Sequence, residues 1–375
     1  MFIGVDVGSR SIRVALFDTE GRKRKHAERD ITVHHPAVEL YEQSSDEIWT
    51  SCCELLSELT EDIDKSSLRG IGFTGTCSLV ISSRERATEL EGSGCDIIMW
   101  LDHRAMQEAE EINASGHPLL DFVGGKVSLE MQMPKLLWLK RNRPEVYQRA
   151  DYFFDLPDYM TWRATQNSAR QGKWNHPGEG KTWDKDFLNA IGLEELADGK
   201  KIGITILPPG TPIPQGISAA MASQTKLPVG LPVGASLIDA HAGALGLLSC
   251  IPKGLPNFEV DEKLLVIAGT SACHMALRRD PSRVPGVWGP QGGSILQGYF
   301  THEGGISAAG EFLSRLLASH PGGNELIQTH SESGAHAVLC KEIERMDASA
   351  TRDIHVWPDV HGNRSPLADP RMKGM

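Results

Sequence analysis

The chain has 375 residues, enough for two domains with a buried core. Its composition, 40% apolar and 23% charged, is typical of a globular protein and argues against a disordered, collagenous or membrane-spanning chain. The net charge of −11 argues against binding to nucleic acid or to an anionic membrane. Asp6 interrupts the first apolar run too early for a secretory signal, so we expect a cytoplasmic protein.

The first hundred residues predict an α/β sheet. Residues 2–18 indicate a β-hairpin, because two apolar, β-branched runs are joined by the polar residues 8–11. Apolar residues then recur at helical spacing, and Ser44 with Glu47 predicts a capping box at the start of this helix. A short strand at 70–73 leads into a polar turn, and an apolar segment at 96–101 ends in Asp102. Strand, helix and strand in this order favour an α/β architecture.

Further elements are expected in the next 150 residues. We predict helices at 104–114 and 134–141 and a strand near 152–154. Residues 165–192 are expected to be mostly loop, and prolines argue against a regular helix in 202–225. A buried strand at 231–238 is expected to lead into a helix at 240–248, with Asp239 at the junction.

Residues 251–257 form the best linker candidate, which separates an expected first domain, 1–250, from a second, 258–375. Just beyond it, residues 264–271 repeat the design of residues 2–9, an apolar strand that ends in glycine and a small hydroxyl residue. Each is followed by a second apolar strand, so we expect two copies of one hairpin, one at the start of each domain.

The two hairpin turns are suited to binding phosphate. Glycine allows a tight turn, and the neighbouring residues can direct backbone N–H groups and hydroxyls toward one anion. The residues concerned are Gly8, Ser9 and Arg10 in the first turn and Gly269, Thr270 and Ser271 in the second. Two such turns from two domains predict a site that clamps a polyphosphate.

Two aspartates are candidates for chemistry beside the phosphates. Asp6 lies two residues before Gly8 and could hold Mg²⁺ through water, although it could equally be satisfied by backbone amides in a surface turn. Asp239 follows a strand and could accept the proton of a substrate hydroxyl that attacks a γ-phosphoryl group. The alternative for Asp239 is an ordinary helix N-cap.

A second set of candidate residues would be suited to binding a sugar. Trp100 offers an aromatic face, with Asp102 nearby to bind hydroxyls, although the segment also fits a strand end before a charged helix. Thr76 and Ser78 would line the same cleft or form a simple Ser/Thr turn. The sequence has no G-x-x-x-x-G-K-[ST] motif of Walker NTPases, no G-x-S-x-G motif of α/β-hydrolases, and no clear G-x-G-x-x-G motif after a strand, as dinucleotide-binding dehydrogenases have.

Taken in order, the motifs at 4–9, 100–104, 239–241 and 268–271 resemble the FGGY family of carbohydrate kinases. The segments at 75–80, 130–132, 154–158, 285–290 and 361–366 are similar to its D-ribulokinase-type branch. The resemblance implies an α/β protein with two ribonuclease-H-like domains of the actin-like ATPase fold, which close over ATP, Mg²⁺ and a sugar.

The resemblance also implies a role for each candidate residue. Asp239 would be the general base, and Asp6 would lie near Mg²⁺. The two glycine turns would bind the phosphates of ATP, although Arg10 stands where the family usually has a small residue or threonine. The sugar pocket would comprise Thr76, Ser78, Trp100, Asp102, Lys173 and Glu303. The implied reaction is phosphorylation of the terminal hydroxyl of a ketopentose, with conversion of D-ribulose to D-ribulose 5-phosphate favoured.

The chain ends soon after the motif at 361–366, before the adenosine-binding segment that the family has. We therefore expect a complete first domain and a partial second one, whose unpaired edge and apolar face would favour association, for example as a homodimer. The principal hypothesis is an ATP-dependent sugar kinase. The alternatives are a catalytically deficient fragment or isoform that binds a sugar or a partner protein, and a non-enzymatic protein with the same fold.

Overall fold

The structure is a computed structural model that describes residues 1–83, 89–90, 94–170, 183–250, 256 and 258–374. Its strands are β1 (Phe2–Val7), β2 (Ser11–Phe17), β3 (Lys23–Asp30), β4 (Glu42–Gln43), β5 (Gly70–Gly75), β6 (Leu79–Ser82), β7 (Ile97–Ile98), β8 (Tyr152–Asp155), β9 (Leu237–Ile238), β10 (Leu264–Ala268), β11 (Ala272–Arg278), β12 (Trp288–Gly292) and β13 (Phe300–Ile306). Its helices are α1 (Ser45–Leu59), α2 (Met106–Ala114), α3 (Gln132–Asn142), α4 (Pro144–Arg149), α5 (Leu156–Thr165), α6 (Lys185–Ala190), α7 (Ala219–Thr225), α8 (Asp239–Ser249), α9 (Gly310–Ser319) and α10 (Pro321–Arg345).

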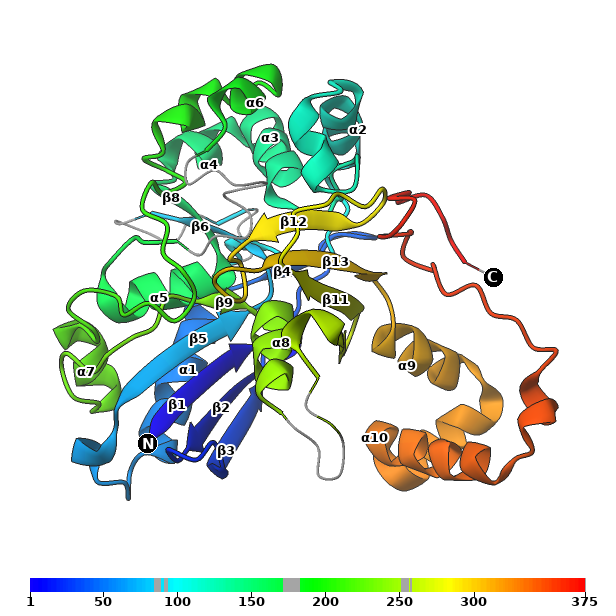
Figure 1. Ribbon diagram of the computed structural model, residues 1–375. Coiled ribbons are helices and arrows are strands. Elements are labelled where there is room, and N and C mark those ends of the chain that lie inside the picture. The colour runs from blue at the N-terminus through cyan, green and yellow to red at the C-terminus, as the bar shows by residue number, and fades with distance from the viewer. Residues whose placement is uncertain (84–88, 91–93, 171–182, 251–255, 257, 375) are drawn as a thin grey trace.

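The first sheet has the strand order β3-β2-β1-β5-β9 (Figure 1). The predicted hairpin forms its centre, where β1 pairs with β2 antiparallel and with β5 parallel. Ile3, Val5 and Val7 alternate along β1 and are buried, as expected for a strand between packed layers. Helix α1 packs against β2 and β3, and α5 packs against β5 and β9.

The N-terminus of α1 follows from the sequence, with one difference. The Ser44 hydroxyl accepts a hydrogen bond from the Glu47 backbone N–H at 3.4 Å, as a cap should. The reciprocal half of the predicted capping box is not formed, because Glu47 Oε1 instead accepts from the backbone N–H and hydroxyl of Thr32, each at 2.9 Å. This contact ties the helix to the segment after β3.

A second antiparallel sheet, with the order β4-β7-β6-β8, forms one end of the molecule together with α2, α3, α4 and α6 (Figure 1). Its core includes Leu79 and Ile81 on β6, Ile98 on β7, and Leu136 and Leu139 on α3, all of them buried. Sheet and helices share one apolar cluster, so this end is a single packed unit.

The third sheet contains the second predicted hairpin and has the order β10-β11-β13-β12. One face packs against α8, where Ala240 and Ala244 contact a cluster that includes Leu265 and Met275. On the other face, Leu264 and Val266 of β10 are 67% and 48% exposed. In the described part of the chain β10 pairs with β11 alone, so it is the edge strand.

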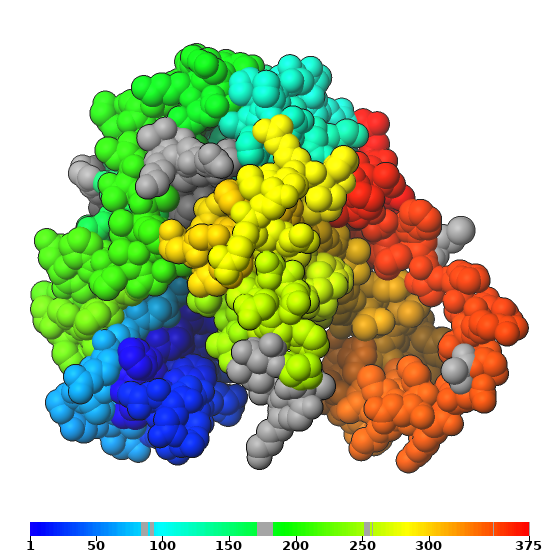
Figure 2. All heavy atoms as spheres, in the orientation of Figure 1, coloured from blue at the N-terminus to red at the C-terminus, as the bar shows by residue number. Residues whose placement is uncertain are grey.

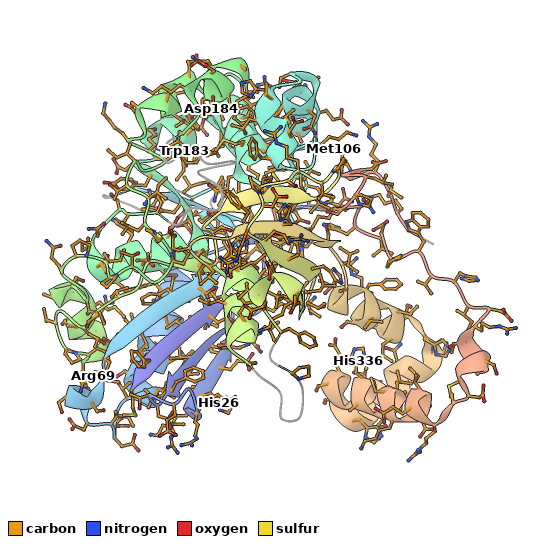
Figure 3. The ribbon with its side chains drawn as sticks, viewed as in Figure 1. His26, Arg69, Met106, Trp183, Asp184 and His336 are labelled. Carbon is orange, nitrogen blue, oxygen red and sulfur yellow. The ribbon has the colours of Figure 1, made fainter. Side chains whose placement is uncertain are left out.

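Helices α9 and α10 pack against each other beside the third sheet, and the chain then returns toward α2 (Figure 1). In Figure 3, His336 on α10 and Asp184 next to α6 lie on opposite sides of the molecule. The space-filling view shows the last residues lying against the α2 region (Figure 2). Arg371 forms an ion pair there with Glu110, and Lys373 pairs with Glu39 at 2.9 Å.

Several predicted elements differ from the structure. The segment 231–238 is a strand only at β9, because its earlier residues make isolated bridges such as the one between Ile71 and Val233. The expected loop at 165–192 contains α6, and 171–182 lie outside the described residues. Helix α7 forms within 202–225 because it begins after the last proline of that segment and is capped by Ser218. The long apolar span required to cross a bilayer occurs in none of the described helices.

Candidate active site

The two hairpin turns face one cavity of about 360 Å³. In the first turn the Gly8 N–H donates to the Ser11 carbonyl at 2.9 Å, and in the second the Gly269 N–H donates to the Ser271 carbonyl at 2.8 Å. The paired residues Val7 and Ile12 close the first turn, and Ala268 and Ala272 close the second, which is one residue shorter. Gly8, Ser9, Gly269, Thr270 and Ser271 all line the cavity. The repeated sequence pattern therefore corresponds to two similar turns that meet across one space.

The N-terminus of α9 supports the second turn from behind. The Ala309 N–H donates to the Thr270 carbonyl at 2.8 Å, and the Gly310 N–H donates to the Gly269 carbonyl at 3.0 Å. A Cβ at Gly310 would lie 2.5 Å from that same carbonyl oxygen, so only glycine permits this approach.

Asp239 lies in the cavity wall between the two turns. It is the first residue of α8 and follows β9, and its Oδ1 accepts a hydrogen bond from the Ala240 N–H at 2.7 Å. The N-cap of α8 is Ile238, so the alternative interpretation of Asp239 as the helix N-cap is wrong. The Asp239 side chain borders the cavity. A carboxylate at this position can accept a proton from a hydroxyl in the cavity.

Asp6 lines the cavity beside the first turn and is paired with a residue that the sequence did not single out. Arg13 Nη1 donates to Asp6 Oδ2 at 2.9 Å, and Arg13 also lines the cavity. Burial raises the pKa of the Asp6 carboxyl, and the Arg13 guanidinium opposes that shift. Arg13 lies beside the first hairpin turn and carries a positive charge, which can attract an anion in the cavity.

The other oxygen of Asp6, Oδ1, is buried and has no hydrogen-bond partner in the described structure. The described residues contain no cluster of three or more metal-binding side chains. One carboxylate fits Mg²⁺ that is bound mainly by water and phosphate oxygens, and it does not fit a metal held wholly by protein. The residues present are therefore compatible with Mg²⁺ delivered together with a nucleotide.

Of the predicted sugar residues, Thr76, Trp100 and Glu303 line the cavity. Ser78 is not among the lining residues. Its hydroxyl lies 2.8 Å from that of Thr76 and accepts the Trp100 backbone N–H at 3.1 Å, so it supports residues that do line the cavity. Lys173 lies outside the described residues.

Asp102 also lies outside the cavity. It is completely buried, and its carboxylate accepts hydrogen bonds from the Tyr41 N–H at 2.7 Å and from Arg104 Nε at 2.8 Å. Arg104 additionally pairs with Glu42 at 2.8 Å. The described structure thus places Asp102 in a buried ion network behind Trp100, because the chain turns away from the cavity directly after the tryptophan.

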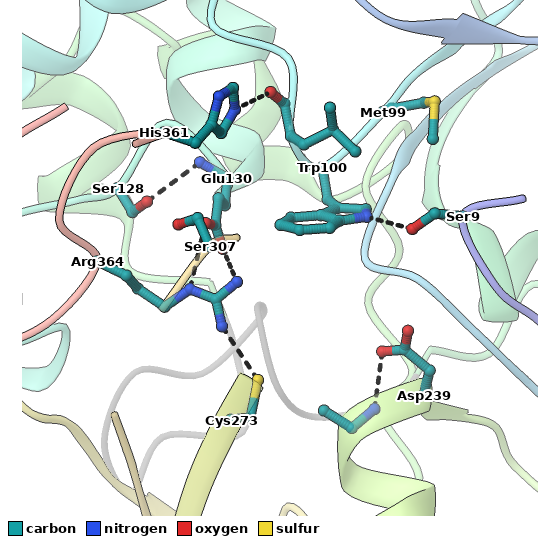
Figure 4. A network of polar contacts seen from close by, with 12 residues as sticks. Ser9, Met99, Trp100, Ser128, Glu130, Asp239, Cys273, Ser307, His361 and Arg364 are labelled. Carbon is teal, nitrogen blue, oxygen red and sulfur yellow. Dashed lines mark hydrogen bonds and ion pairs between the residues drawn. The ribbon is translucent and has the colours of Figure 1, made fainter. Parts of the chain in front are cut away.

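Trp100 is fixed by contacts on two sides. Its indole Nε1 donates to the Ser9 hydroxyl at 2.9 Å, which joins the aromatic ring to the first hairpin turn (Figure 4). The Lys135 ammonium is buried and donates to the carbonyls of Met99 at 2.7 Å and Trp100 at 3.0 Å. Burial lowers the pKa of Lys135 to about 8.

Arg10 points away from the main cavity, in contrast to the other predicted turn residues. It lines a smaller cavity of about 150 Å³ and pairs with Glu311 on α9 at 2.5 Å. Gly8 and Ser9 of the first turn thus line the main cavity, and the Arg10 side chain links that turn to the segment that supports the second turn.

The lining residues that were not predicted as site residues include Glu130, Cys273, Trp288 and Arg364. Glu130, Trp288 and Arg364 belong to segments by which the sequence resembles the D-ribulokinase-type branch. The sequence alone cannot place them, because the bonded pair Glu130 and Arg364 is 234 residues apart.

The arrangement defines the class of protein. Two β-hairpin turns, each at the start of a sheet, meet across one cavity that is also lined by a carboxylate at the start of a helix. A gluconate kinase from Lactobacillus acidophilus superposes with a TM-score of 0.77 at 18% identity, covering 100% of this chain and 71% of that one. A xylulose kinase from Rhodospirillum rubrum gives a TM-score of 0.75 at 21% identity, covering 100% and 72%. These likenesses show the actin-like, ribonuclease-H-like fold.

The family follows from the sequence comparisons. Residues 1–246 match the N-terminal domain of the FGGY family of carbohydrate kinases, and residues 264–375 match its C-terminal domain. The chain belongs to this family, whose members transfer a phosphoryl group to a sugar hydroxyl.

Named relatives refine the comparison. An FGGY carbohydrate kinase domain-containing protein of Danio rerio is 44% identical over 398 residues, covering 100% of this chain and 73% of the relative. The Homo sapiens protein of the same description is 41% identical, covering 100% and 72%. A D-ribulokinase of Saccharomyces cerevisiae is 35% identical, covering 99% of this chain and 59% of the relative.

Proposed function

We propose that the protein is an ATP-dependent pentulose kinase that phosphorylates the terminal hydroxyl of a ketopentose, with D-ribulose converted to D-ribulose 5-phosphate. The observation that carries this proposal is the placement of Asp239 in one cavity with both glycine turns. The identity with a D-ribulokinase supports the choice of sugar. The site would lie between domains that we assign to residues 1–250 and 258–375.

The two turns would bind the phosphates of ATP. Gly8 and Ser9 on one side, and Gly269, Thr270 and Ser271 on the other, offer backbone N–H groups and hydroxyls to a polyphosphate, and Arg13 adds a positive charge. A Cβ at Gly269 would meet no atom within 4 Å, so this glycine borders open space. Asp6 would hold Mg²⁺ through water, and the ion would neutralise charge on the phosphates.

Asp239 would act as the general base. The terminal hydroxyl oxygen of the sugar attacks the γ-phosphorus while the bond from that phosphorus to the β–γ bridging oxygen breaks, and ADP leaves. The hydroxyl proton passes to the Asp239 carboxylate. Trp100 would cover the apolar face of the sugar, and Thr76 and Glu303 would bind its hydroxyls.

The test measures ADP formation by the purified chain with ATP and Mg²⁺ in the presence of D-ribulose, L-ribulose, xylulose, ribitol or glycerol. Asp239→Asn is compared with Asp184→Asn, a variant at the helix cap of α6 that lies outside the cavity. We expect turnover with D-ribulose to fall about 10²–10⁴-fold in Asp239→Asn, the usual contribution of a general base, and to persist in Asp184→Asn.

Three results would refute the proposal in whole or in part. Equal turnover in Asp239→Asn and the unsubstituted chain would remove the assignment of the base. Preference for another acceptor, with Asp239 still required, would retain the kinase but change its substrate. Sugar binding without any turnover would argue for the alternative of a protein that binds sugar without phosphorylating it.

A further inference from the structure

A buried ion pair forms part of the cavity wall opposite Asp239 (Figure 4). Arg364 Nη2 lies 2.8 Å from Glu130 Oε2, and Arg364 Nε donates to Glu130 Oε1 at 3.2 Å, so the contact is bidentate. The two side chains are only 3% and 6% exposed. The Ser307 hydroxyl also donates to Glu130 Oε1, at 2.5 Å.

The pair joins parts of the protein that are distant in sequence. Glu130 belongs to the N-terminal FGGY domain, and Arg364 belongs to the C-terminal one. Arg364 Nη1 also donates to the thiol of Cys273 at 3.0 Å, on the strand that follows the second phosphate turn. One guanidinium therefore contacts both domains inside the cavity.

The same guanidinium lies near both tryptophans of the cavity. Its Cζ is 5.7 Å from the ring centroid of Trp100 and 5.6 Å from that of Trp288, within the range of a cation–π contact. Because Trp100 also bonds to Ser9, contacts run continuously from the first phosphate turn through the indole and Arg364 to Glu130.

A contribution to stability alone does not explain this pair. Two buried charges must both be desolvated, and replacing such a pair by apolar residues is often neutral for stability or even stabilising. What arginine supplies and an apolar residue does not is a planar, charged group with fixed hydrogen-bond directions. That property suits a group that orients its neighbours.

We propose that Arg364, held by Glu130, is a positioning residue that fixes Trp100 and Trp288 as the aromatic wall of the sugar site and ties the C-terminal domain to it. This inference rests on the proposed function for its catalytic consequence. Arg364 acts through the two rings, so its loss weakens sugar binding more than ATP binding.

The test separates positioning from stability with four variants. Arg364→Lys keeps the charge and loses the planar fork, whereas Arg364→Met leaves Glu130 buried without its partner. Arg364→Met combined with Glu130→Gln removes both charges. Arg371→Met is the matched control, because Arg371 lies on the same segment and pairs with Glu110 but is 69% exposed and outside the main cavity.

We expect the KM for D-ribulose to rise about 10-fold or more in Arg364→Lys and Arg364→Met, with the KM for ATP within about 2-fold of the original value. The melting temperature should fall in Arg364→Met and recover in the double variant, whose KM for D-ribulose should stay high. If both the melting temperature and the KM for D-ribulose return to their original values in the double variant, the ion pair is purely structural and the proposal is overturned.

A second readout does not depend on activity. The chain is labelled with 5-fluorotryptophan, and the ¹⁹F resonances of the two rings are assigned with Trp100→Phe and Trp288→Phe. We expect both resonances to shift in ligand-free Arg364→Lys and to stay in place in Arg371→Met. If the unsubstituted chain phosphorylates no sugar, the proposed function fails. The ¹⁹F comparison of Arg364→Lys with Arg371→Met then still decides whether Arg364 positions the two rings. Unshifted resonances in Arg364→Lys would overturn it.

Discussion

Gly269 allows the second phosphate turn to be tested separately from the stability of the fold. A Cβ built on Gly269 meets no atom within 4 Å, and the residue is not in the left-handed region, so Gly269→Ala should fold without strain. Alanine also reduces the freedom of the unfolded chain, which stabilises the folded state by about 0.4–1 kcal/mol at a compatible site. We therefore expect a melting temperature that is unchanged or slightly raised.

The effect on nucleotide binding should have the opposite sign. The methyl group is added at a residue that lines the cavity beside Thr270 and Ser271, where we place the phosphates, and it would occupy open space there. A phosphate displaced from the N–H groups of the turn should lose at least about 1.4 kcal/mol, which is a tenfold rise in the KM for ATP. The KM for D-ribulose should change little, because the sugar residues lie elsewhere in the cavity wall.

The measurement combines a steady-state ADP assay with a thermal melt of the same protein. Gly72→Ala is the control, because Gly72 also has no atom within 4 Å of a built Cβ, yet it lies in β5 and outside the cavity. An unchanged KM for ATP in Gly269→Ala would show that the turn does not bind phosphate. A large loss of stability would show that the space around Gly269 is not open.

Three further outcomes are expected. Trp100→Phe keeps an aromatic face but loses the bond to the Ser9 hydroxyl, so the KM for ATP should rise while the KM for the sugar changes little. Trp100→Ala loses both the bond and the aromatic face, so the KM for the sugar should rise as well, and by more than the KM for ATP. Equal KM values for the sugar in the two variants would contradict this assignment. Gly310→Ala places a Cβ 2.5 Å from the Gly269 carbonyl oxygen, so it should move the second turn and weaken ATP binding. Its melting temperature should be lower than that of Gly269→Ala. Normal nucleotide binding in Gly310→Ala would argue against the support of the turn by α9. Burial lowers the pKa of His103 from 6.5 to about 3, and the stacked His361 adds to this shift. Below pH 6.5 the unfolded chain therefore takes up a proton at this histidine that the folded chain does not. The free energy of unfolding should fall by about 1.4 kcal/mol for each pH unit toward pH 3. Urea midpoints of His103→Gln should show a weaker pH dependence over that range, and an unchanged slope would exclude His103 as its source.

The local features of the chain could be predicted from its sequence. Each hairpin is made by residues that are close together along the chain, so alternating apolar residues and a glycine turn predict both strands and the connection. Helix α1 begins after Ser44 for a similar reason, because its cap and its apolar face lie within one short segment. Asp239 at the junction of a strand and a helix is likewise a local property.

The direction in which each side chain points could not be predicted from the sequence and depends on the tertiary structure. Trp100 and Asp102 are two residues apart in one motif, yet only the tryptophan reaches the cavity, because the chain turns after β7 and Arg104 binds the aspartate behind it. The Arg10 side chain leaves the phosphate turn for Glu311, a residue that is 301 positions away.

The cavity wall shows most clearly the difference between local features, which the sequence determines, and contacts that depend on the tertiary structure. Glu130, just before α3, and Arg364, near the end of the chain, bring a carboxylate and a guanidinium together only because the fold places these distant segments next to each other (Figure 4). Local sequence determines turns and helix ends because their hydrogen bonds close within a few residues. The partner of a buried charge is decided by the packing of distant segments, since burial of the charge requires a neighbour of opposite sign wherever the fold places one.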